Sequence, residues 1–111
     1  MPLKDANGKL LARNVVTWRN PLRQSLGLYC QKPKPDTAYL FLFPRDVRHA
    51  FDMLLVFSPI DVYFLDERKK IVDLKQRFKP FTLYRPSKPY RYAIETKAGM
   101  LDLRVGEKLS F

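Results

Sequence analysis

The feature of this sequence that most constrains its fold is a series of short segments rich in aromatic and β-branched residues, each followed by a turn-forming cluster. Aromatic and β-branched side chains suit a pleated, half-buried strand, whereas Pro, Gly, Asp and Ser suit turns. Five such segments occupy residues 38–43, 53–57, 61–65, 70–77 and 90–95, and a further strand is expected within residues 9–18. The pattern predicts a mainly β fold, a small sandwich or barrel of about six to eight short strands.

One short helix is expected near residues 21–29. Asn20 can cap free backbone amides, and Pro21 suits the first helical position because no hydrogen bond is lost there. Apolar residues then recur at helical spacing. The prolines within residues 31–37 favour an extended loop, so the helix should end near Cys30.

Size and charge narrow the class of protein further. With 111 residues, 46% of them hydrophobic, the chain predicts a single domain over residues 1–111. No apolar stretch approaches the ~20 residues that span a bilayer, and residues 1–12 lack the pattern of a targeting signal, so a cytoplasmic protein is expected. A net charge of +10 favours nucleic acid or another polyanion as a partner, although a protein partner is an equally open alternative.

Few residues suit catalysis or metal binding. Cys30 and His49 are the only cysteine and histidine, which excludes an internal disulfide and the usual zinc sites. His49 lies in a charged turn and is expected to be solvated, and Cys30 is expected to be buried rather than nucleophilic. No glycine-rich phosphate loop is present. We therefore expect no cofactor and favour a protein that is not an enzyme.

Asp61 is the strongest acidic candidate, because it begins an otherwise apolar strand. In the simpler interpretation its carboxylate caps a turn. In the alternative, Asp61 is a buried acid lining a pocket with Asp52 and Tyr63. A small enzyme centred on Asp61 would require these groups to converge, and burial of Asp61 beside a turn amide alone would exclude it.

Most of the positive charge lies in residues 68–91. This stretch contains nine basic residues and one acid, Asp73, so it has a net charge of +8 out of the total of +10. As a strand, residues 74–79 would project three cations to one side and leave Leu74 and Phe78 for the other. Interleaved aromatic and basic residues of this kind hold single-stranded nucleic acid. The candidate binding residues are Lys75, Arg77, Lys79, Phe81, Tyr84, Arg85, Lys88 and Arg91. The alternative is that the aromatics belong to the core and the cations form a solvated face.

Four segments, in order, also resemble one family. Leu26-Gly27-Leu28 resembles its Gly-Leu-Met turn, and residues 58–66 are similar to its Pro-Leu-Asp strand. Tyr92-Ala93-Ile94-Glu95 with Ala98-Gly99 resembles its closing strand and turn, and residues 106–111 follow its final segment. On these motifs the chain resembles the domain-of-unknown-function 192 family.

The resemblance implies a compact β architecture with a short helix, and it implies no particular reaction or cofactor. The sequence departs from many relatives at one place: Met53 is followed by Leu54, Leu55 and Val56 where they have Lys-Asn-Thr. If that polar cluster binds a ligand in relatives, the corresponding function is not expected in this chain.

These observations lead to one leading hypothesis and two alternatives. The leading hypothesis is a non-enzymatic binding or interaction domain whose ligand is unknown. The first alternative is binding of single-stranded RNA or DNA through residues 68–91. The second is a small enzyme centred on Asp61.

Overall fold

A central sheet of five strands organises the protein in a computed structural model that describes residues 2–29, 31–53 and 56–111. The helix α1 spans Pro21–Leu26. The strands found in the described residues are β1 (Leu3–Asp5), β2 (Leu10–Ala12), β3 (Asn14–Trp18), β4 (Thr37–Val47), β5 (Phe51–Asp52), β6 (Ile60–Leu65), β7 (Ile71–Phe78), β8 (Leu83–Tyr84), β9 (Tyr90–Lys97) and β10 (Leu109–Ser110). The protein is mainly β, as predicted, and the strands beyond the expected number have only two or three residues.

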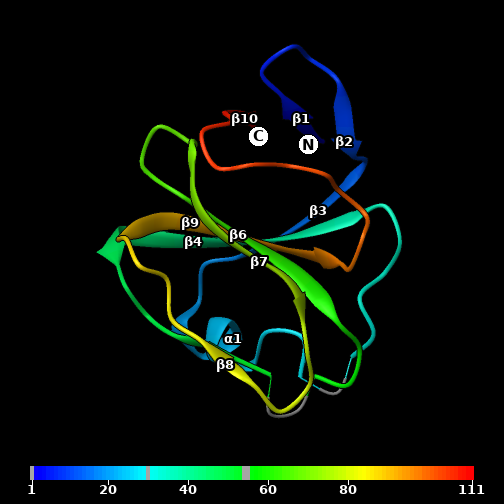
Figure 1. The fold of residues 1–111 in the computed structure, drawn as a ribbon, viewed down its shortest axis with the longest axis vertical. Coiled ribbons are helices and arrows are strands. Elements are labelled where there is room, and N and C mark those ends of the chain that lie inside the picture. The colour runs from blue at the N-terminus through cyan, green and yellow to red at the C-terminus, as the bar shows by residue number, and fades with distance from the viewer. Residues whose placement is uncertain (1, 30, 54–55) are drawn as a thin grey trace.

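The elements form a sandwich-like arrangement of layers (Figure 1). The central sheet has the order β3-β4-β9-β6-β7, in which β3 runs parallel to β4 and the other neighbours are antiparallel. The small sheet β10-β1-β2 covers one face, and α1 with the β5-β8 pair covers the other. Both faces of the central sheet are therefore largely covered, which is why the middle strands carry buried apolar side chains on both faces.

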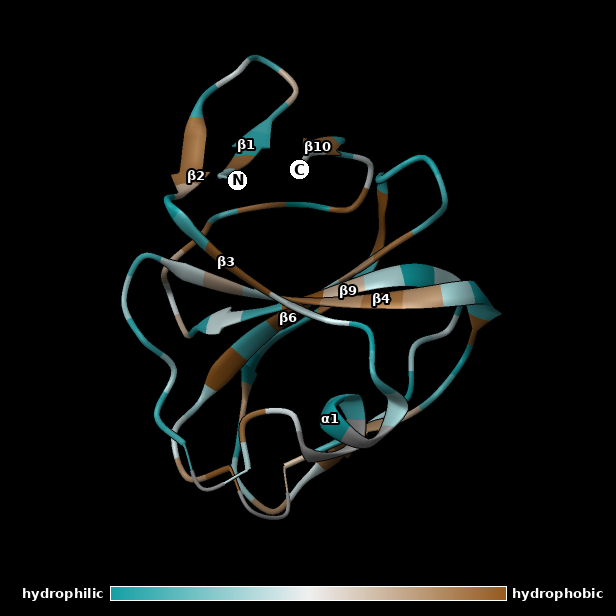
Figure 2. Ribbon diagram, turned by 180° about the vertical axis from the view of Figure 1, so that it is seen from behind, coloured by the Kyte–Doolittle hydropathy of each residue, from teal (hydrophilic) through white to brown (hydrophobic). Residues whose placement is uncertain are grey.

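Strand β6 shows how one segment serves both layers. All six residues of Ile60–Leu65 are buried, and side chains alternate between faces along a strand. Val62 and Phe64 belong to the hydrophobic cluster on the α1 side, whereas Tyr63 and Leu65 belong to the cluster under the small sheet. Figure 2 shows the resulting concentration of hydrophobic residues along the central strands, with hydrophilic residues mainly in the connections.

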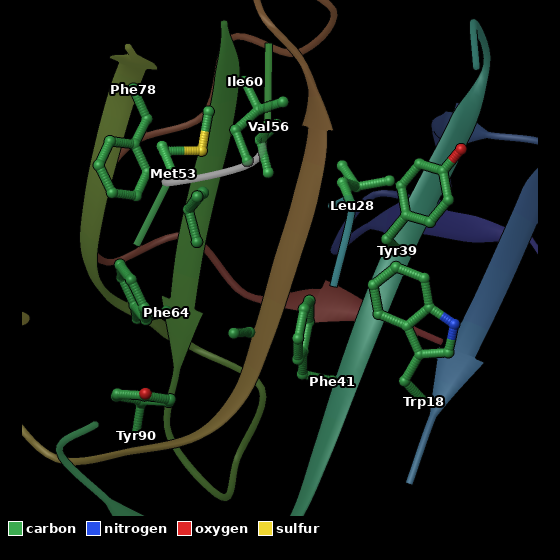
Figure 3. Packing of buried hydrophobic residues seen from close by; sticks show 12 residues of the cluster. Trp18, Leu28, Tyr39, Phe41, Met53, Val56, Ile60, Phe64, Phe78 and Tyr90 are labelled. Carbon is green, nitrogen blue, oxygen red and sulfur yellow. The ribbon is translucent and has the colours of Figure 1, made fainter. Parts of the chain in front are cut away.

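The cluster on the α1 side is dominated by aromatic rings (Figure 3). Phe41, Phe64 and Tyr90 project into it from β4, β6 and β9. Phe64 and Tyr90 have ring centroids 4.8 Å apart, and Trp18 meets Phe41 edge-to-face at 5.1 Å. Tilted and edge-to-face contacts suit the ring quadrupoles and add to the stabilisation from burial.

The predicted cap of α1 is confirmed. Asn20 Oδ1 accepts a hydrogen bond from the Arg23 amide, and the Asn20 carbonyl accepts the amide of Gln24. The helix ends at Leu26, before the predicted end near Cys30, because Gly27 adopts a positive φ of 50° that ends helical geometry. Cys30 itself lies outside the described residues.

Two segments differ from their predicted structure. The expected strand at 53–57 is not observed in its described residues, Met53, Val56 and Phe57, and residues 54–55 lie outside the described part. Residues 44–50 were expected to separate two strands, yet β4 continues to Val47. The β4–β9 register shifts between Leu42 and Val47, which lets Pro44 sit in the strand without breaking a ladder bond.

Strand β7 also departs from simple alternation. Leu74 and Phe78 were expected on the same face, and this is wrong: Leu74 packs in the cluster under the small sheet and Phe78 in the cluster on the α1 side. The cause is a bulge, because Ile60 pairs with Phe78 but Val62 pairs with Lys75, which places one extra residue on β7. Arg77, within the bulge, has a φ of 51°.

No helix among the described residues is long and apolar enough to cross a membrane.

Candidate ligand-binding site

A cavity of about 720 Å³ lies on the α1 side of the central sheet. One wall is the end of α1 with the residues that follow it, and the opposite wall comes from the later part of β4 and from residues 49–52. Exposed residues at its rim, among them Arg45 and Ala50, open it to solvent. Its size falls within the range of small-molecule sites, about 300–1,000 Å³. The lining residues that carry its chemistry are Gln24, Gly27, Tyr29, Phe41, Phe43, Arg45, Asp46, His49, Phe51, Asp52 and Glu95.

Glu95 is the buried acid of this cavity. On β9 it pairs with Tyr39 of β4 and Val62 of β6, and both belong to the cluster on the α1 side, so Glu95 faces the same side. Its side chain is 6% exposed, and Oε1 accepts no hydrogen bond from any described residue. Burial first, and then the negative charge of Asp52, raises the pKa of Glu95 to about 8. Glu95 is therefore largely protonated at neutral pH.

Asp52 is the second acid of the cavity, and it is held by Tyr29. The Tyr29 hydroxyl donates a hydrogen bond to Asp52 Oδ1 and joins the chain after α1 to β5. Burial, this hydrogen bond and the charge of Asp52 together raise the pKa of Tyr29 to about 12. Tyr29 therefore remains a neutral donor at physiological pH and fixes the position of Asp52.

The rim of the cavity carries His49 and an ion pair. The imidazole of His49 lies edge-on to Phe43, with ring centroids 5.9 Å apart, and the His49 carbonyl accepts a hydrogen bond from Tyr90. His49 is exposed, as predicted, but it also lines the cavity. Asp46 is paired with Arg91 at 3.0 Å between Oδ1 and Nε. A solvated residue can thus still border a binding site.

Asp61 lies elsewhere and has a structural role. It is 2% exposed, and both of its oxygens accept backbone hydrogen bonds: Oδ1 from the Arg77 amide at 2.8 Å and Oδ2 from the Gly99 amide at 3.0 Å. The carboxylate thus joins the β7 bulge to the turn after β9. Neither Asp61 nor Tyr63 lines the cavity that contains Asp52, and the Tyr63 hydroxyl donates to the Leu101 carbonyl. The convergence that an enzyme centred on Asp61 requires is not found among the described residues.

The basic stretch is divided between two ends of the sheet. Phe78 pairs with Ile60, which also pairs with Lys97, so Arg77 and Lys79 lie at the end where β9 finishes. The strand β9 begins at the opposite end, near Leu65, and Lys88 and Arg91 belong there. Strands of six residues separate the two ends by roughly 20 Å. The eight predicted binding residues are therefore spread along the sheet and not gathered at one of its ends.

The aromatic members of that stretch have different environments. Tyr84 packs against Phe64 and Phe78, its hydroxyl donates to Asp73 at 2.8 Å, and Lys75 Nζ lies 5.7 Å from its ring. Phe81, by contrast, is 69% exposed. The Arg85 side chain bonds the Arg48 carbonyl. Only part of the predicted interface is free to contact a partner.

The sequence analysis named Asp52 but missed Glu95 as a site residue. The sequence signal for Glu95 was weak, because by strand alternation its neighbour Ala93 is apolar but Arg91 and Lys97 are charged. The end of α1 could not be assigned to this cavity from sequence, because the contact between α1 and β9 joins residues about 70 apart in the chain. No group of three potential metal ligands was found among the described residues.

Comparison with known proteins supports the fold. The sequence profile of DUF192, described as "Uncharacterized ACR", matches residues 3–111. The chain is 30% identical to a UPF0127 protein of Pyrococcus furiosus, over 98% of this chain and 96% of that protein. It is 36% identical to a UPF0127 protein of Thermococcus sibiricus, but the match covers 63% of this chain and 46% of that longer relative. A crystal structure of a protein of unknown function from Novosphingobium aromaticivorans superimposes with a TM-score of 0.87 at 18% identity, over 100% of this chain and 84% of that one.

Proposed function

The chain belongs to the DUF192 family, and from its site we propose that it binds a small molecule in the cavity beneath α1 without catalysing a reaction on it. The observation that carries this proposal is the cavity itself: about 720 Å³, walled by aromatic side chains, with a few polar groups converging on it. Concave, mainly apolar sites with a small number of placed polar groups are typical of ligand binding.

The contacts of the cavity support a pre-formed site. Gln24 Nε2 donates to the carbonyls of Trp18 and Leu42, at 2.8 and 2.7 Å, and so fixes α1 against β3 and β4. Tyr29 fixes Asp52 on the opposite side. A site whose walls are already held in place loses little conformational entropy when a ligand binds.

The proposal is tested by blocking the cavity from its rim. Ala50 lines the cavity and is exposed, so Ala50→Trp should fill the space without disturbing the core. Fragments that bind the wild type are first identified in a ligand-observed NMR screen. In protein-observed spectra we expect these fragments to shift the amide signals of Gly27, Phe51 and Glu95. Ala50→Trp should weaken their binding by about tenfold or more, or about 1.4 kcal/mol.

Ala6→Trp is the matched control, because Ala6 is exposed in a turn of the small sheet on the opposite side of the protein. Binding that survives Ala50→Trp, or fragments that shift amides only outside the cavity, would contradict the proposal.

A second candidate function is binding of single-stranded nucleic acid, and one observation favours it. Phe81 and Phe57 are 69% and 58% exposed, and their ring centroids lie 6.2 Å apart. Exposed rings beside cations such as Lys79 can stack on unpaired bases. The candidate surface is thereby narrowed to the end of the sheet with Lys75, Arg77, Lys79 and Phe81.

Fluorescence anisotropy of labelled single-stranded RNA and DNA tests this candidate at low and near-physiological salt. If it is correct, binding should survive physiological salt and fall by about tenfold or more in a variant with Lys75, Arg77 and Lys79 replaced by Glu. A triple variant of Lys4, Lys9 and Lys108 to Glu changes the net charge equally on the small-sheet side. Equal loss in both variants, or binding at low salt only, would leave the basic residues as a solvated surface.

A further inference from the structure

The unpartnered oxygen of Glu95 is the strongest unexplained feature of the cavity. Buried polar atoms are nearly always hydrogen-bonded, so an exception needs an explanation. Glu95 Oε1 is close to the end of α1: a Cβ built on Gly27 would lie 3.9 Å from it. An atom so near to backbone and side-chain donors would normally be satisfied by one of them.

Three donors along the cavity wall already bond elsewhere. The Gly27 amide donates to the Arg23 carbonyl, and Tyr29 donates to Asp52. Gln24 Nε2 donates to two backbone carbonyls. These groups cannot turn to Glu95 without losing bonds that hold α1 in place. The wall is thus arranged so that the acid faces the cavity with its acceptor free.

The charge of the cavity opposes that of the protein. The chain has 21 basic residues and 11 acids, yet the cavity is lined by Glu95, Asp52 and Asp46 against one arginine, Arg45. Asp46 is neutralised by its ion pair at the rim. The two inner acids, Glu95 and Asp52, are therefore the groups that a ligand would meet.

Aromatic rings complete the surroundings. Phe41 and Phe51 have ring centroids 5.1 Å apart, and Phe41 and Phe43 lie 6.5 Å apart in a stacked arrangement. All three line the cavity. Ring faces carry partial negative charge and attract cations, more strongly where water is excluded.

Taking the cavity to be the binding site proposed above, we infer that its ligand is a small organic cation with N–H donors on an apolar or aromatic body, and that its N–H group bonds Glu95. An ammonium or guanidinium group supplies donors to the free acceptor and charge to both acids. The apolar body contacts the phenylalanine rings.

A neutral acceptor is the competing ligand class, and the second acid disfavours it. Such a ligand would accept a hydrogen bond from the protonated carboxyl group of Glu95. Its lone pairs would then lie close to the negative charge of Asp52. A cation instead allows Glu95 to ionise and offsets the repulsion between the acids. The charged arrangement gives the free oxygen of Glu95 a donor and places positive charge beside both acids.

Binding of a cation beside Glu95 should depend on pH. Because burial and Asp52 raise the pKa of Glu95 to about 8, binding of a cation below that pH must release the Glu95 proton. Affinity should rise about tenfold per pH unit up to about pH 8 and then level off. Among the described residues, the other titratable or charged groups that line the cavity are Asp52, Tyr29, Asp46, Arg45 and His49. A Glu95 variant separates the contribution of Glu95 from those of the other groups.

Two probes of nearly equal shape test the ligand class: benzylguanidinium, which is charged throughout the pH range, and benzylurea, its neutral counterpart. NMR titrations at pH 6, 7, 8 and 9 measure both affinities through the amides of Gly27 and Glu95. At pH 8 we expect the cation to bind at least about tenfold more tightly than benzylurea, with affinity rising from pH 6. Glu95→Gln should remove the preference and most of the rise, whereas Glu67→Gln, an exposed acid-to-amide control, should change neither.

The outcomes separate this inference from the proposed function. If benzylurea or the anion phenylacetate binds in the cavity as tightly as the cation, or if Glu95→Gln binds the cation unchanged, the ligand class is wrong while the cavity remains a binding site. If no probe, of either charge, shifts the cavity amides, and the fragment screen also finds none that Ala50→Trp blocks, the proposed function fails and this inference fails with it.

Discussion

Asp61 and Glu95 are both buried carboxylates of the central sheet, on opposite faces. Strand alternation places Asp61 on the side of Tyr63, under the small sheet, and Glu95 on the side of α1. Asp61 accepts two backbone amides, one with each oxygen. Glu95 has an oxygen that accepts nothing from the described residues, and it faces a cavity. Burial alone therefore does not identify a site acid; the partners of each oxygen do.

The difference follows from what covers each face. The small sheet and the segment that returns to β10 bring backbone amides and apolar side chains onto their face, and the Gly99 turn reaches Asp61 directly. The other face is covered by α1, the β5-β8 pair and connections, and two of its side-chain donors are already used: Gln24 by the carbonyls of Trp18 and Leu42, and Tyr29 by Asp52. The small-sheet side satisfies both oxygens of its acid, whereas the α1 side leaves one oxygen of Glu95 without a hydrogen-bond donor among the described residues.

The largest expected difference between the two acids is in the pH dependence of stability. Between pH 4.5, the ordinary value for Glu, and about 8, the folded protein holds a proton on Glu95 that the unfolded chain has lost. The free energy of unfolding should therefore fall as pH rises through this window, by about 1.4 kcal/mol per pH unit from this group. Glu95→Gln has no such titrating proton. As the pH rises from 5 to 8, its free energy of unfolding should therefore increase progressively relative to that of the wild type. Urea unfolding at pH 5, 6, 7 and 8 measures this difference.

Glu67→Gln serves as the control and should follow the wild type at every pH. A parallel pH dependence in wild type and Glu95→Gln would mean that Glu95 is solvated in the folded state, and would remove the contrast with Asp61.

Loss of Asp61 comes next in expected size. Asp61→Ala leaves the amides of Arg77 and Gly99 without their acceptor, and an orphaned amide in a part-buried site costs about 1–3 kcal/mol. We expect the free energy of unfolding to drop by about 2–3 kcal/mol at pH 7. Asp102→Ala, an exposed acid at the surface, should stay within about 0.5 kcal/mol of the wild type. A loss for Asp61→Ala no larger than this control would show that the two amides find other partners.

The smallest effect is expected from the side chain of Arg77, because Asp61 bonds its backbone and not its guanidinium. Arg77→Gly keeps that amide and relieves a positive φ of 51°, while the unfolded chain gains freedom. These opposing terms should leave stability within about 1 kcal/mol of the wild type. A loss as large as that of Asp61→Ala, in the same unfolding assay, would assign the role of the bulge to the arginine side chain instead.

Much of the fold could be predicted because its signals are local. The apolar run of β6 and the Asn20–Pro21 helix start depend on neighbouring residues only, and both are confirmed. Strand ends were less predictable: β4 runs through Pro44 because a register shift accommodates it. The prediction that Leu74 and Phe78 share a face was wrong, because a bulge changes the alternation of β7. The bulge lies where Asp61 accepts a hydrogen bond from the Arg77 amide.

The candidate site was less accessible to sequence reasoning. Asp52 and His49 were noted separately, but nothing in the sequence indicates that they share a cavity with Glu95. The basic stretch was the stronger sequence signal, and its members lie at two ends of the sheet. Its role in binding nucleic acid remains a prediction for the anisotropy experiment.

By itself, the sequence determined the β-rich class, the position of the helix start and the family, because propensity, capping and ordered motifs are properties of short segments. Only the tertiary structure decided which buried acid is satisfied and which is free, and which aromatics are core and which are exposed. Those properties depend on partners far apart in the chain: Asp61 meets Gly99 across 38 residues. Glu95 lies beside Gly27 at the end of α1, a residue even more distant in the sequence. Hydrogen-bond satisfaction of a buried group is a property of packing, and no local pattern encodes it.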